Sequence, residues 1–488
     1  MAISLLYPDG IAPTAVLPDE GLLSHLSLEG AFGVICPDVK RRGYFMRVLS
    51  ELNTDRRVIE YRQRILMDFR GNPTLLPRLT ALSERFDALR STAKQAARED
   101  FRLTIDDSRS PDAAKNLLAA RALDCKRALL FVKAFAELLS CGTIQSEGLL
   151  SLRKACAEIA DGADFPKLLA LCAKYENGGI HGFTDCKITL GEDGRIADCQ
   201  LIDHRHIHIT DPDQKRKAFP PFRRQKEPEQ PCERLNPAKG DSYDTLICAA
   251  TASLTGLFAS MAEQLFERFA PFCRGLTFYE TACRYMDALA DRGLPCCFPT
   301  FPADGGVHIR GLYDLTLAMS TPGNVVPNDL RLEPEQRGIL LFGDNSSGKT
   351  VFLRSVGCAQ LLAQAGLPVA AKEARLTFHT GMASQFAENE KAGVDAGRFE
   401  QEVRDLASMV DSLRAGSLVF LNETFQSTAY DEGAEGLYEL LRYFSDCGIR
   451  WMLVSHLRAL EEKFDRREAL ILHTGTGFRV SEVSEMLP

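Results

Sequence analysis

The run Gly343-Asp344-Asn345-Ser346-Ser347-Gly348-Lys349-Thr350 has the residue types and spacing of a loop that cradles the phosphates of a nucleoside triphosphate. Its two glycines let the backbone curl, so that successive N–H groups point inward at phosphate oxygens. Lys349 can then reach the outer phosphates, and the Thr350 hydroxyl can join the shell of a magnesium ion. The alternative is an ordinary glycine turn. The apolar strand expected at 338–342, and the helix expected from Val351 onward with its positive end toward the anion, favour phosphate binding.

A second group of polar residues follows two apolar runs farther along the chain. The run 417–421 predicts a buried strand that leads into Asn422 and Glu423. A carboxylate there can orient the water that attacks the outer phosphate, which makes Glu423 the candidate catalytic base. Asn422 stands where an aspartate usually holds the magnesium shell, and because an amide carries no charge, we expect weaker magnesium binding. The strand expected at 450–455 delivers His456, which we expect to sense the outer phosphate; a histidine that only caps the strand is the alternative.

Taken together, these motifs resemble the ATPase domain of MutS-type DNA mismatch repair proteins. Ahead of the loop, Val325-Val326-Pro327-Asn328-Asp329-Leu330 is similar to the family's VPND segment, in which the residues before the Pro-Asn pair pack on the adenine ring. The resemblance implies an ATP site formed by residues 343–351 with Val325 and Val326, and a magnesium ion held by Thr350 and Asn422. Further matches, in the family's order, are 352–356, 363–370, 423–433 and Ser455-His456.

The resemblance is weaker in the first half of the chain, and one motif departs from it. Residues Val58 to Leu66 resemble the start of the family's helical core. The family's signature segment appears as Gly397-Arg398-Phe399-Glu400-Gln401-Glu402, without its Ser-Thr pair. Because a guanidinium binds phosphate strongly, we hypothesise that Arg398 acts as an arginine finger across a homodimer. The alternative is a solvated arginine at a helix start.

The elements that position these residues predict a multi-domain chain: an α-helical core and lever domain with a small β-rich insertion, followed by an α/β P-loop NTPase domain of the ABC/MutS type. Apolar residues recur at helical spacing from about 76 to 169 and from 243 to 289, and short strands are expected between 182 and 241. The expected segments are 1–45 (N-terminal), 46–181 (helical core and lever, first part), 182–241 (clamp-like insertion with a basic loop), 242–305 (lever helices, second part) and 306–488 (ATPase domain).

Composition limits the function further. The net charge of −8 argues against a protein that coats nucleic acid by bulk electrostatics, so any DNA contact must be local. No apolar run approaches membrane-spanning length, and the N-terminus lacks the features of a signal peptide, so we expect a cytoplasmic protein. The 15 cysteines are odd in number and scattered, which is typical of core residues in a reducing compartment.

One strongly basic stretch stands out in the β-rich segment. It interleaves Phe219 and Phe222 with cations and suits a DNA backbone, since Lys and Arg bind phosphates and an exposed aromatic ring can stack on a base. The neighbouring prolines are equally typical of a solvated linker, which is the alternative. The candidate nucleic-acid contacts are Lys215, Arg216, Lys217, Arg223, Arg224 and Lys226.

Two further patterns resemble functional sites without their usual context. His204, His206 and His208 would share one face of a strand and could ligate zinc, but no ligand-spacing motif supports this. Phe278-Tyr279-Glu280 imitates the Phe-x-Glu wedge by which mismatch-reading relatives probe a base step. The family carries that wedge in an N-terminal domain, so we expect Phe278 to pack in a core instead.

The resemblance implies an ATP-dependent clamp that binds mismatched, branched or duplex DNA and opens or slides as ATP is bound and slowly hydrolysed. The alternative is a nucleotide-gated DNA-binding or scaffold protein with negligible hydrolysis, because Asn422 and Arg398 both depart from the hydrolytic pattern. With the helical core starting so near residue 46, we expect no mismatch-reading module before it. With only about thirty residues after His456, we expect dimerisation through the ATPase faces.

Overall fold

The computed structural model describes residues 3–11, 21–103, 111–176, 186–190, 196–201, 234–235, 243–321, 323, 325–386, 398–425 and 430–482. The chain divides into two compact units. Among the described residues, the helical unit comprises Ala81–Ser140 and Arg153–Ala270, and the sheet unit comprises Ile3–Thr80, Cys141–Leu152 and Pro271 onward. These two units are groups of residues that pack together, and they do not test the boundaries of the five segments expected from the sequence. Those five segments therefore stay a prediction.

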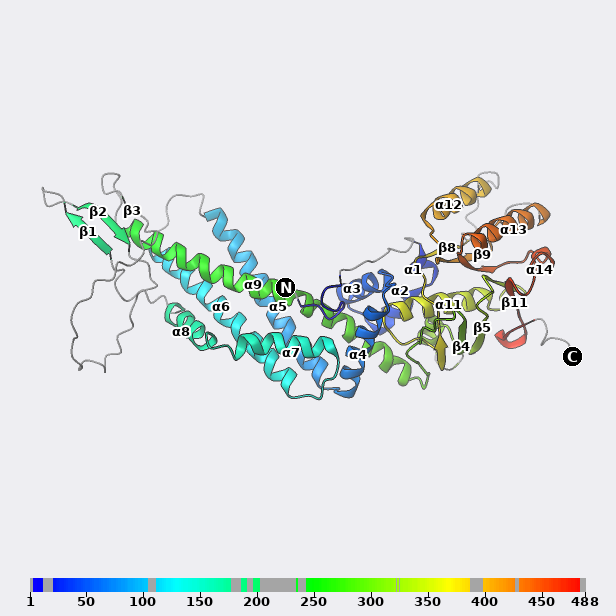
Figure 1. Ribbon diagram of the computed structural model, residues 1–488, viewed down its shortest axis with the longest axis horizontal. Coiled ribbons are helices and arrows are strands. Elements are labelled where there is room, and N and C mark those ends of the chain that lie inside the picture. Colours follow the sequence, from blue (N-terminus) through cyan, green and yellow to red (C-terminus); the bar gives the residue numbers. More distant parts are fainter. Residues whose placement is uncertain are drawn as a thin grey trace. The chain divides into compact units, whose positions relative to one another are not determined.

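Long helices build the helical unit, as the helical spacing predicted (Figure 1). An aromatic cluster holds them together: the Phe86 ring meets Phe131 and Phe266 edge-on, with ring centroids 5.7 and 5.3 Å apart, and also contacts Phe269. Such edge-to-face pairs stabilise a core beyond their buried area. The helices are α5 (Leu75–Leu103), α6 (Pro111–Ser140), α7 (Glu147–Ala160), α8 (Phe165–Tyr175) and α9 (Tyr243–Ala290), of which α5, α7 and α9 extend by sequence into the sheet unit.

Among the described residues, three short strands interrupt the helices, which confirms the expected change to short strands between 182 and 241. They are β1 (Cys186–Leu190), β2 (Ile196–Leu201) and β3 (Arg234–Leu235), and they pair antiparallel in the order β1-β2-β3. The basic stretch from Lys215 to Lys226 and the three histidines at 204, 206 and 208 lie outside the described residues. Both interpretations of these segments therefore stay predictions.

The sheet unit is built on a six-stranded sheet in the order β12-β11-β6-β10-β9-β8. All neighbours are parallel except β12, which pairs antiparallel with β11. Parallel neighbours require crossover connections, and helices supply them. The strands are β6 (Gly338–Phe342), β8 (Met382–Phe386), β9 (Leu418–Asn422), β10 (Arg450–Val454), β11 (Ala469–Thr474) and β12 (Val480–Glu482); the helices are α11 (Lys349–Gln364), α12 (Arg398–Ser412), α13 (Tyr430–Asp446) and α14 (Ala459–Lys463).

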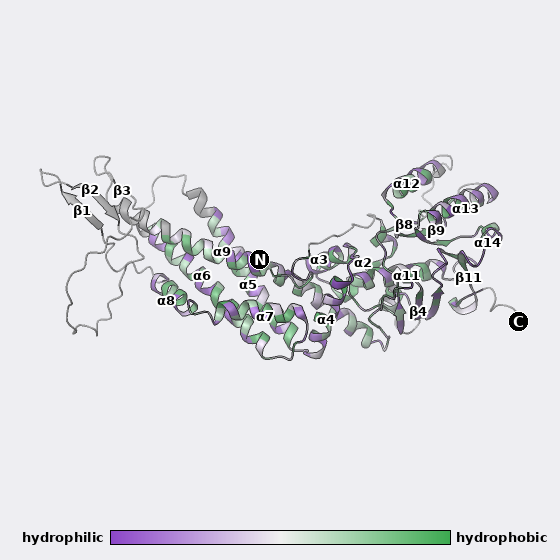
Figure 2. Cartoon of the chain, viewed as in Figure 1, coloured by the Kyte–Doolittle hydropathy of each residue, from purple (hydrophilic) through white to green (hydrophobic). Residues whose placement is uncertain are grey.

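A smaller antiparallel sheet and four N-terminal helices complete the sheet unit. The small sheet has the order β5-β4-β7, and the short helix α10 (Leu315–Ser320) follows β4. In Figure 2 the helices α12 and α13 mix hydrophobic and hydrophilic residues, as expected of helices with one solvated face. The remaining bounds are β4 (Val307–Leu312), β5 (Asn328–Leu332), β7 (Glu373–Arg375), α1 (Leu22–His25), α2 (Leu28–Ile35), α3 (Val39–Ser50) and α4 (Arg56–Gly71).

A buried arginine connects the N-terminal helix α4 to the C-terminal end of α11. Arg62 in α4 has no exposed surface, and its guanidinium donates to the Leu6 carbonyl at 2.9 Å and to the Ala365 carbonyl at 3.2 Å. Ala365 is the residue that follows α11, so the cation meets the negative end of that helix. The rings of Tyr7 and Phe278 lie 5.0 and 5.6 Å from the guanidinium carbon. Phe278 and Tyr279 are fully buried, which confirms that this pattern is core packing.

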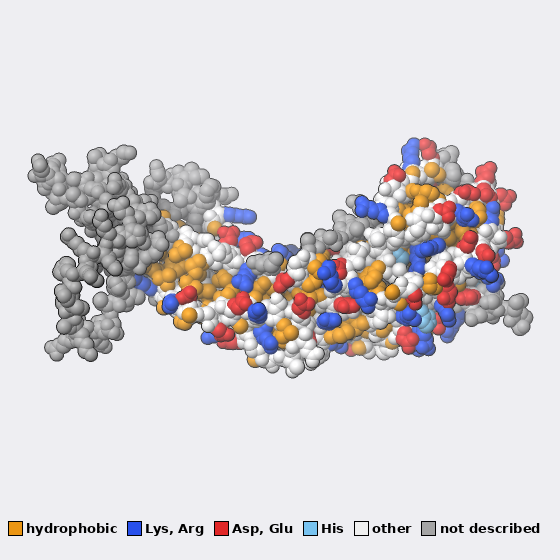
Figure 3. Space-filling model, viewed as in Figure 1, with side chains coloured by type: hydrophobic (Ala, Val, Ile, Leu, Met, Phe, Trp, Pro, Cys, Tyr) orange, Lys and Arg blue, Asp and Glu red, His pale blue; other side chains and the backbone are white. Residues whose placement is uncertain are grey.

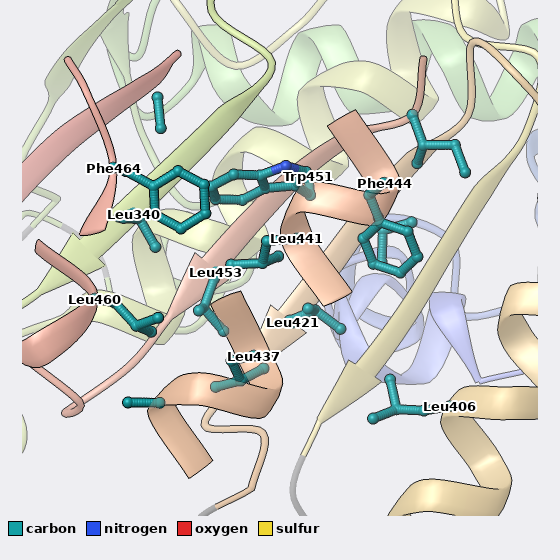
Figure 4. Close-up of a cluster of buried hydrophobic side chains, with 14 of the residues drawn as sticks. Leu340, Leu406, Leu421, Leu437, Leu441, Phe444, Trp451, Leu453, Leu460 and Phe464 are labelled. Atoms are coloured by element: carbon teal, nitrogen blue, oxygen red, sulfur yellow. The ribbon is translucent and has the colours of Figure 1, made fainter. Parts of the chain in front are cut away.

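One hydrophobic cluster of the sheet unit lies between α13 and the central strands (Figure 4). Leu437, Leu441 and Phe444 of α13 are fully buried against it. Trp451 of β10 is 1% exposed and donates its indole N–H to the Ser445 hydroxyl at 3.0 Å. Charged side chains of both signs are scattered over the outer face drawn in Figure 3. No helix of the described residues is long and apolar enough to cross a membrane.

Candidate nucleotide site

The strand order brings three separate segments to one edge of the large sheet. β10 lies between β6 and β9, and Val454 at its end pairs with Leu341 on one side and Asn422 on the other. Because the three strands are parallel, the segments that follow them leave the sheet at the same edge. Those segments are the loop 343–350, the Asn422-Glu423 pair and His456.

The loop 343–350 has the curled backbone that its glycines predict. Gly343 and Gly348 have φ of 153° and 94°, and Ser346 between them is also left-handed at 63°. A Cβ atom on Gly343 would come within 1.7 Å of the Thr474 hydroxyl oxygen, so no larger residue fits there. Gly348 immediately precedes α11, whose first-turn N–H groups face the loop. This arrangement of a glycine cradle and a helix N-terminus fits a phosphate group.

Lys349 is the cation of the site. It is only 4% exposed, and its ammonium donates to the carbonyls of Gly343 and Asp344 at 2.8 and 2.9 Å. Burial lowers its pKa, while the nearby carboxylates of Glu423 and Asp344 oppose this shift. A buried ammonium held by two carbonyls gains stability from an anion, which a phosphate would supply.

Thr350 and Asn422 face each other across the loop. The Thr350 hydroxyl donates to the Asn422 amide oxygen at 2.9 Å. Hydroxyl and amide oxygens are hard ligands that suit Mg²⁺ or its bound water, so the donor set fits this ion. Asn422 brings no negative charge. Because Asn422 lies beside Thr350, where the magnesium shell is expected, we still expect weaker magnesium binding than with an aspartate.

Glu423 and His456 form the third element of the site. A Glu423 carboxylate oxygen lies 2.8 Å from the Nε2 atom of His456, and both side chains are partly exposed to the cavity. Glu423 has a left-handed backbone, φ 58°, and its N–H donates to the Val454 carbonyl at 2.9 Å. The carboxylate is thus held at the mouth of the loop by backbone and side chain together.

A cavity of about 770 Å³ contains these polar groups together with apolar side chains. It is lined by residues 345–351 with Glu423 and His456. Its apolar lining includes Leu312, Leu317, Val325, Val326 and Phe478. The pair Val325-Val326, expected to pack on a base, therefore lines the same cavity as the loop. A volume of this size is typical of a cofactor or substrate site.

Phe478 is one of the lining residues that the sequence did not predict. Its side chain is 56% exposed, its backbone is left-handed at φ 62°, and its ring lies next to Gly348. Asn328 holds the segment, because its amide donates to the Phe478 carbonyl at 3.2 Å and accepts from the Val480 N–H at 2.8 Å. An exposed ring beside a phosphate loop suits stacking on a nucleobase. Asn328 belongs to the VPND-like segment that the sequence singled out. The sequence did not indicate, however, that Asn328 contacts Phe478 and Val480.

Two sets of candidate residues lie wholly or partly outside the described structure. Arg398 begins α12, but its side chain lies outside the described part of the chain, as does Gly397. The arginine-finger hypothesis therefore stays a prediction. The same holds for the six basic residues from Lys215 to Lys226.

Comparison with known proteins identifies the domain that holds this site. Residues 339–475 match the family model for MutS domain V. This range begins within β6 and ends just after β11, so it includes the loop, Glu423 and His456.

Individual relatives agree with the family model. The chain is 29% identical over 147 residues to Endonuclease MutS2 of Thermus thermophilus, an alignment that covers 30% of this chain and 20% of that protein. It is 32% identical over 176 residues to the DNA mismatch repair protein MutS of Desulfovibrio desulfuricans, covering 35% and 19%. The chain thus spans about a fifth of the length of the curated relatives it matches.

Proposed function

Because residues 339–475 match MutS domain V and the relatives of this segment are MutS and MutS2 proteins, we propose that this chain binds and hydrolyses ATP in the cavity described above and couples this to DNA binding. The observation that carries the proposal is the convergence of Lys349, the Thr350–Asn422 pair and the Glu423–His456 pair at one edge of the sheet. Three functional groups from three distant segments have no packing reason to share one cavity. They are the groups that phosphoryl transfer requires.

Each group has a defined task in this proposal. The backbone N–H groups of the loop and the Lys349 ammonium hold the phosphates, and Thr350 with Asn422 holds the magnesium shell. When bound, Mg²⁺ neutralises charge on the phosphate oxygens. Glu423 orients a water molecule and accepts its proton. His456 holds the carboxylate in position at 2.8 Å, and in this proposal it responds to the outer phosphate in the cavity that it lines.

At the level of the molecule, we expect a clamp that takes mismatched, branched or duplex DNA and opens or slides as nucleotide is bound and hydrolysed. The names of the relatives, a DNA mismatch repair protein and an endonuclease, support DNA as the ligand. A homodimer through the ATPase faces would complete two nucleotide sites, with Arg398 as the candidate contact in trans. The basic stretch from Lys215 to Lys226 is the candidate contact for the DNA backbone.

Steady-state ATP hydrolysis tests the enzymatic part. We expect Glu423→Gln to lower kcat by about a hundredfold or more while ATP still binds, because only proton transfer and water positioning are lost. Glu461→Gln is a matched control: Glu461 also contacts a histidine, His473 at 3.2 Å, but does not line the cavity. Equal turnover in Glu423→Gln and wild type would exclude Glu423 as the base.

A second candidate function is a nucleotide-gated DNA-binding or scaffold protein with negligible hydrolysis. Asn422 favours it, because the position next to the base carries an amide instead of a carboxylate. DNA affinity measured with ATP, with ADP and without nucleotide separates the two. Negligible wild-type turnover with an ATP-dependent DNA affinity supports gating alone. If the affinity for DNA and the lifetime of the DNA complex are the same with ATP, with ADP and without nucleotide, both candidate functions are contradicted.

A further inference from the structure

A second cavity, of about 520 Å³, lies in the sheet unit between α12 and α13, away from the loop 343–350. On α12 it is lined by Val403, Leu406 and Val410, which are three and four residues apart and so form one stripe. On α13 it is lined by Gly436 and Leu440. The stripe on α12 extends for about 10 Å, two helical turns. We call this elongated space the α12–α13 groove.

Gly436 lines the groove, although the packing around it would also accept a residue with a Cβ atom. Gly436 lies inside α13 and is exposed. A Cβ atom there would meet only the Phe425 ring, at an ordinary 3.6 Å. A glycine in a helix interior destabilises it by roughly 0.5–1 kcal/mol relative to alanine. An exposed glycine at this position instead lets another backbone approach α13 closely. Ala407 on α12, also exposed, has the same effect on the facing wall.

The rim of the groove is acidic. Asp411 on α12 and Glu432 on α13 line it, and both are exposed. The two helices together contain nine acidic and three basic residues, so this part of the chain carries much of the net charge of −8. Figure 3 shows hydrophobic atoms next to acidic side chains over these helices. An occupant must therefore be apolar in the middle and basic at its edges.

We propose that the α12–α13 groove binds one amphipathic helix of a partner protein, with apolar residues at i, i+3 or i+4, and i+7 and with Lys or Arg on both flanks. Helices pack by placing such ridges into the grooves of other helices. The exposed side chain of Val403, 41% accessible, and the partly buried Val410 and Leu440 supply the apolar contacts. Asp411 and Glu432 select the basic flanks. This inference does not depend on ATP hydrolysis: Phe425 lines both this groove and the nucleotide cavity, but no residue of the loop 343–350 and neither Glu423 nor His456 lines the groove.

Synthetic peptides test the proposal on the full-length protein. The probe is a helical peptide of about 20 residues with leucines at the stated spacing and lysines on its flanks, long enough to form a helix. Its counterpart carries glutamates in place of the lysines. By fluorescence anisotropy we expect the lysine peptide to bind at least about tenfold more tightly, a difference of about 1.4 kcal/mol.

Two pairs of variants locate the binding. Gly436→Leu fills the groove and is expected to weaken the lysine peptide at least tenfold, whereas Ser408→Leu, exposed on α12 outside the groove, leaves it unchanged. The double variant Asp411→Lys with Glu432→Lys is expected to reverse the preference between the two peptides. Asp446→Lys, exposed on α13 beyond the groove, keeps the preference.

Unaltered binding to Gly436→Leu, or equal loss in Ser408→Leu, would overturn the proposal. So would a self-association that Gly436→Leu abolishes when neither peptide binds, because a second copy of this chain is then the occupant. Trp451 fluorescence in urea shows whether each variant is folded, since this single tryptophan is buried in the core of the same unit. A variant that unfolds is replaced by Gly436→Val, a smaller filling substitution.

Discussion

Two of the strained residues of the candidate site lie shortly after β9. Glu423 and Phe425 are left-handed, with φ of 58° and 64°, a conformation that costs about 1–2 kcal/mol for a residue with a Cβ atom. The surroundings must therefore hold it, and the hydrogen bond from the Glu423 N–H to Val454 does so. Strain of this kind is concentrated at functional sites. Here it keeps the carboxylate in contact with His456 and with the cavity.

A buried histidine of the sheet unit makes its stability depend on pH. His379 is 4% exposed, and burial, assisted by the nearby Arg450, lowers its pKa to about 4. Its ring nitrogen Nδ1 lies 3.1 Å from the Gly416 carbonyl. Between about pH 6.5 and 4 the unfolded chain binds a proton that the native state does not, so the free energy of unfolding falls as pH falls through this window. We expect His379→Gln to reduce the loss between pH 7 and 5 by about 2 kcal/mol.

The measurement is urea unfolding followed by Trp451 fluorescence at the two pH values, which reports the sheet unit. His308→Gln is the matched control, because His308 is exposed on β4 in the native state as in the unfolded one. Parallel pH profiles for wild type and His379→Gln would show that this ring is not the titrating group.

The residues of the candidate site were largely predictable, but their partners were not. The loop 343–350, Glu423 and His456 have types and spacings that imply chemistry beside apolar strands. Nothing in the sequence indicated Phe478, because a single phenylalanine in a glycine-containing turn has no motif. Its place depends on Asn328, which is 150 residues away along the chain. Such contacts exist only once the chain is folded.

At the scale of elements, apolar patterns predicted three of the six strands of the large sheet, β6, β9 and β10, to within about one residue, since buried strands have a simple signal; β8, β11 and β12 were not predicted. β6 spans 338–342 as expected, and β9 runs from 418 to 422 where 417–421 was expected. The contact between α4 and α11 could not be predicted from the sequence, because Arg62 donates to a carbonyl that is 303 residues away along the chain. Periodicity reports which face of a helix is buried, but not what covers it.

The pairing of β6 with β10 depends on a glycine. A Cβ atom on Gly338 would come within 2.1 Å of the Trp451 ring, which is fixed by its own hydrogen bond to Ser445. Gly338→Ala must therefore displace the largest side chain of the core, and overpacking of this kind costs about 1–3 kcal/mol. We expect its urea midpoint, followed by Trp451 fluorescence, to fall accordingly.

Gly43→Ala is the control for the same substitution in the same unit. Gly43 lies in α3, where a Cβ atom would have no neighbouring atom within 4 Å, so alanine there should raise stability by roughly 0.5–1 kcal/mol. An undiminished midpoint for Gly338→Ala would mean that the strands can separate to admit the methyl group, contrary to the close packing described above.

At the scale of the whole molecule, the sequence indicated helical and α/β parts but not which segments pack together. Residues 3–80 belong to the same compact unit as Pro271 onward, although about 190 residues separate them. The unit boundaries fall within α5, α7 and α9, where the helical pattern continues without a break. A boundary inside a continuous helix leaves no composition change or linker for sequence reasoning to find.

DNA binding, if it follows the proposed function, should depend on a local patch because the net charge of −8 opposes any uniform attraction. Each phosphate contact by Lys or Arg adds about 0.9 to the slope of log affinity against log salt. We expect the triple alanine variant at Lys215, Arg216 and Lys217 to lower that slope by up to about 2.7. A triple alanine variant at Arg56, Arg57 and Arg64, exposed on α4, changes the net charge equally and should leave the slope unchanged. If both triples lower it equally, the attraction is a property of total charge, and the basic stretch is an ordinary solvated segment.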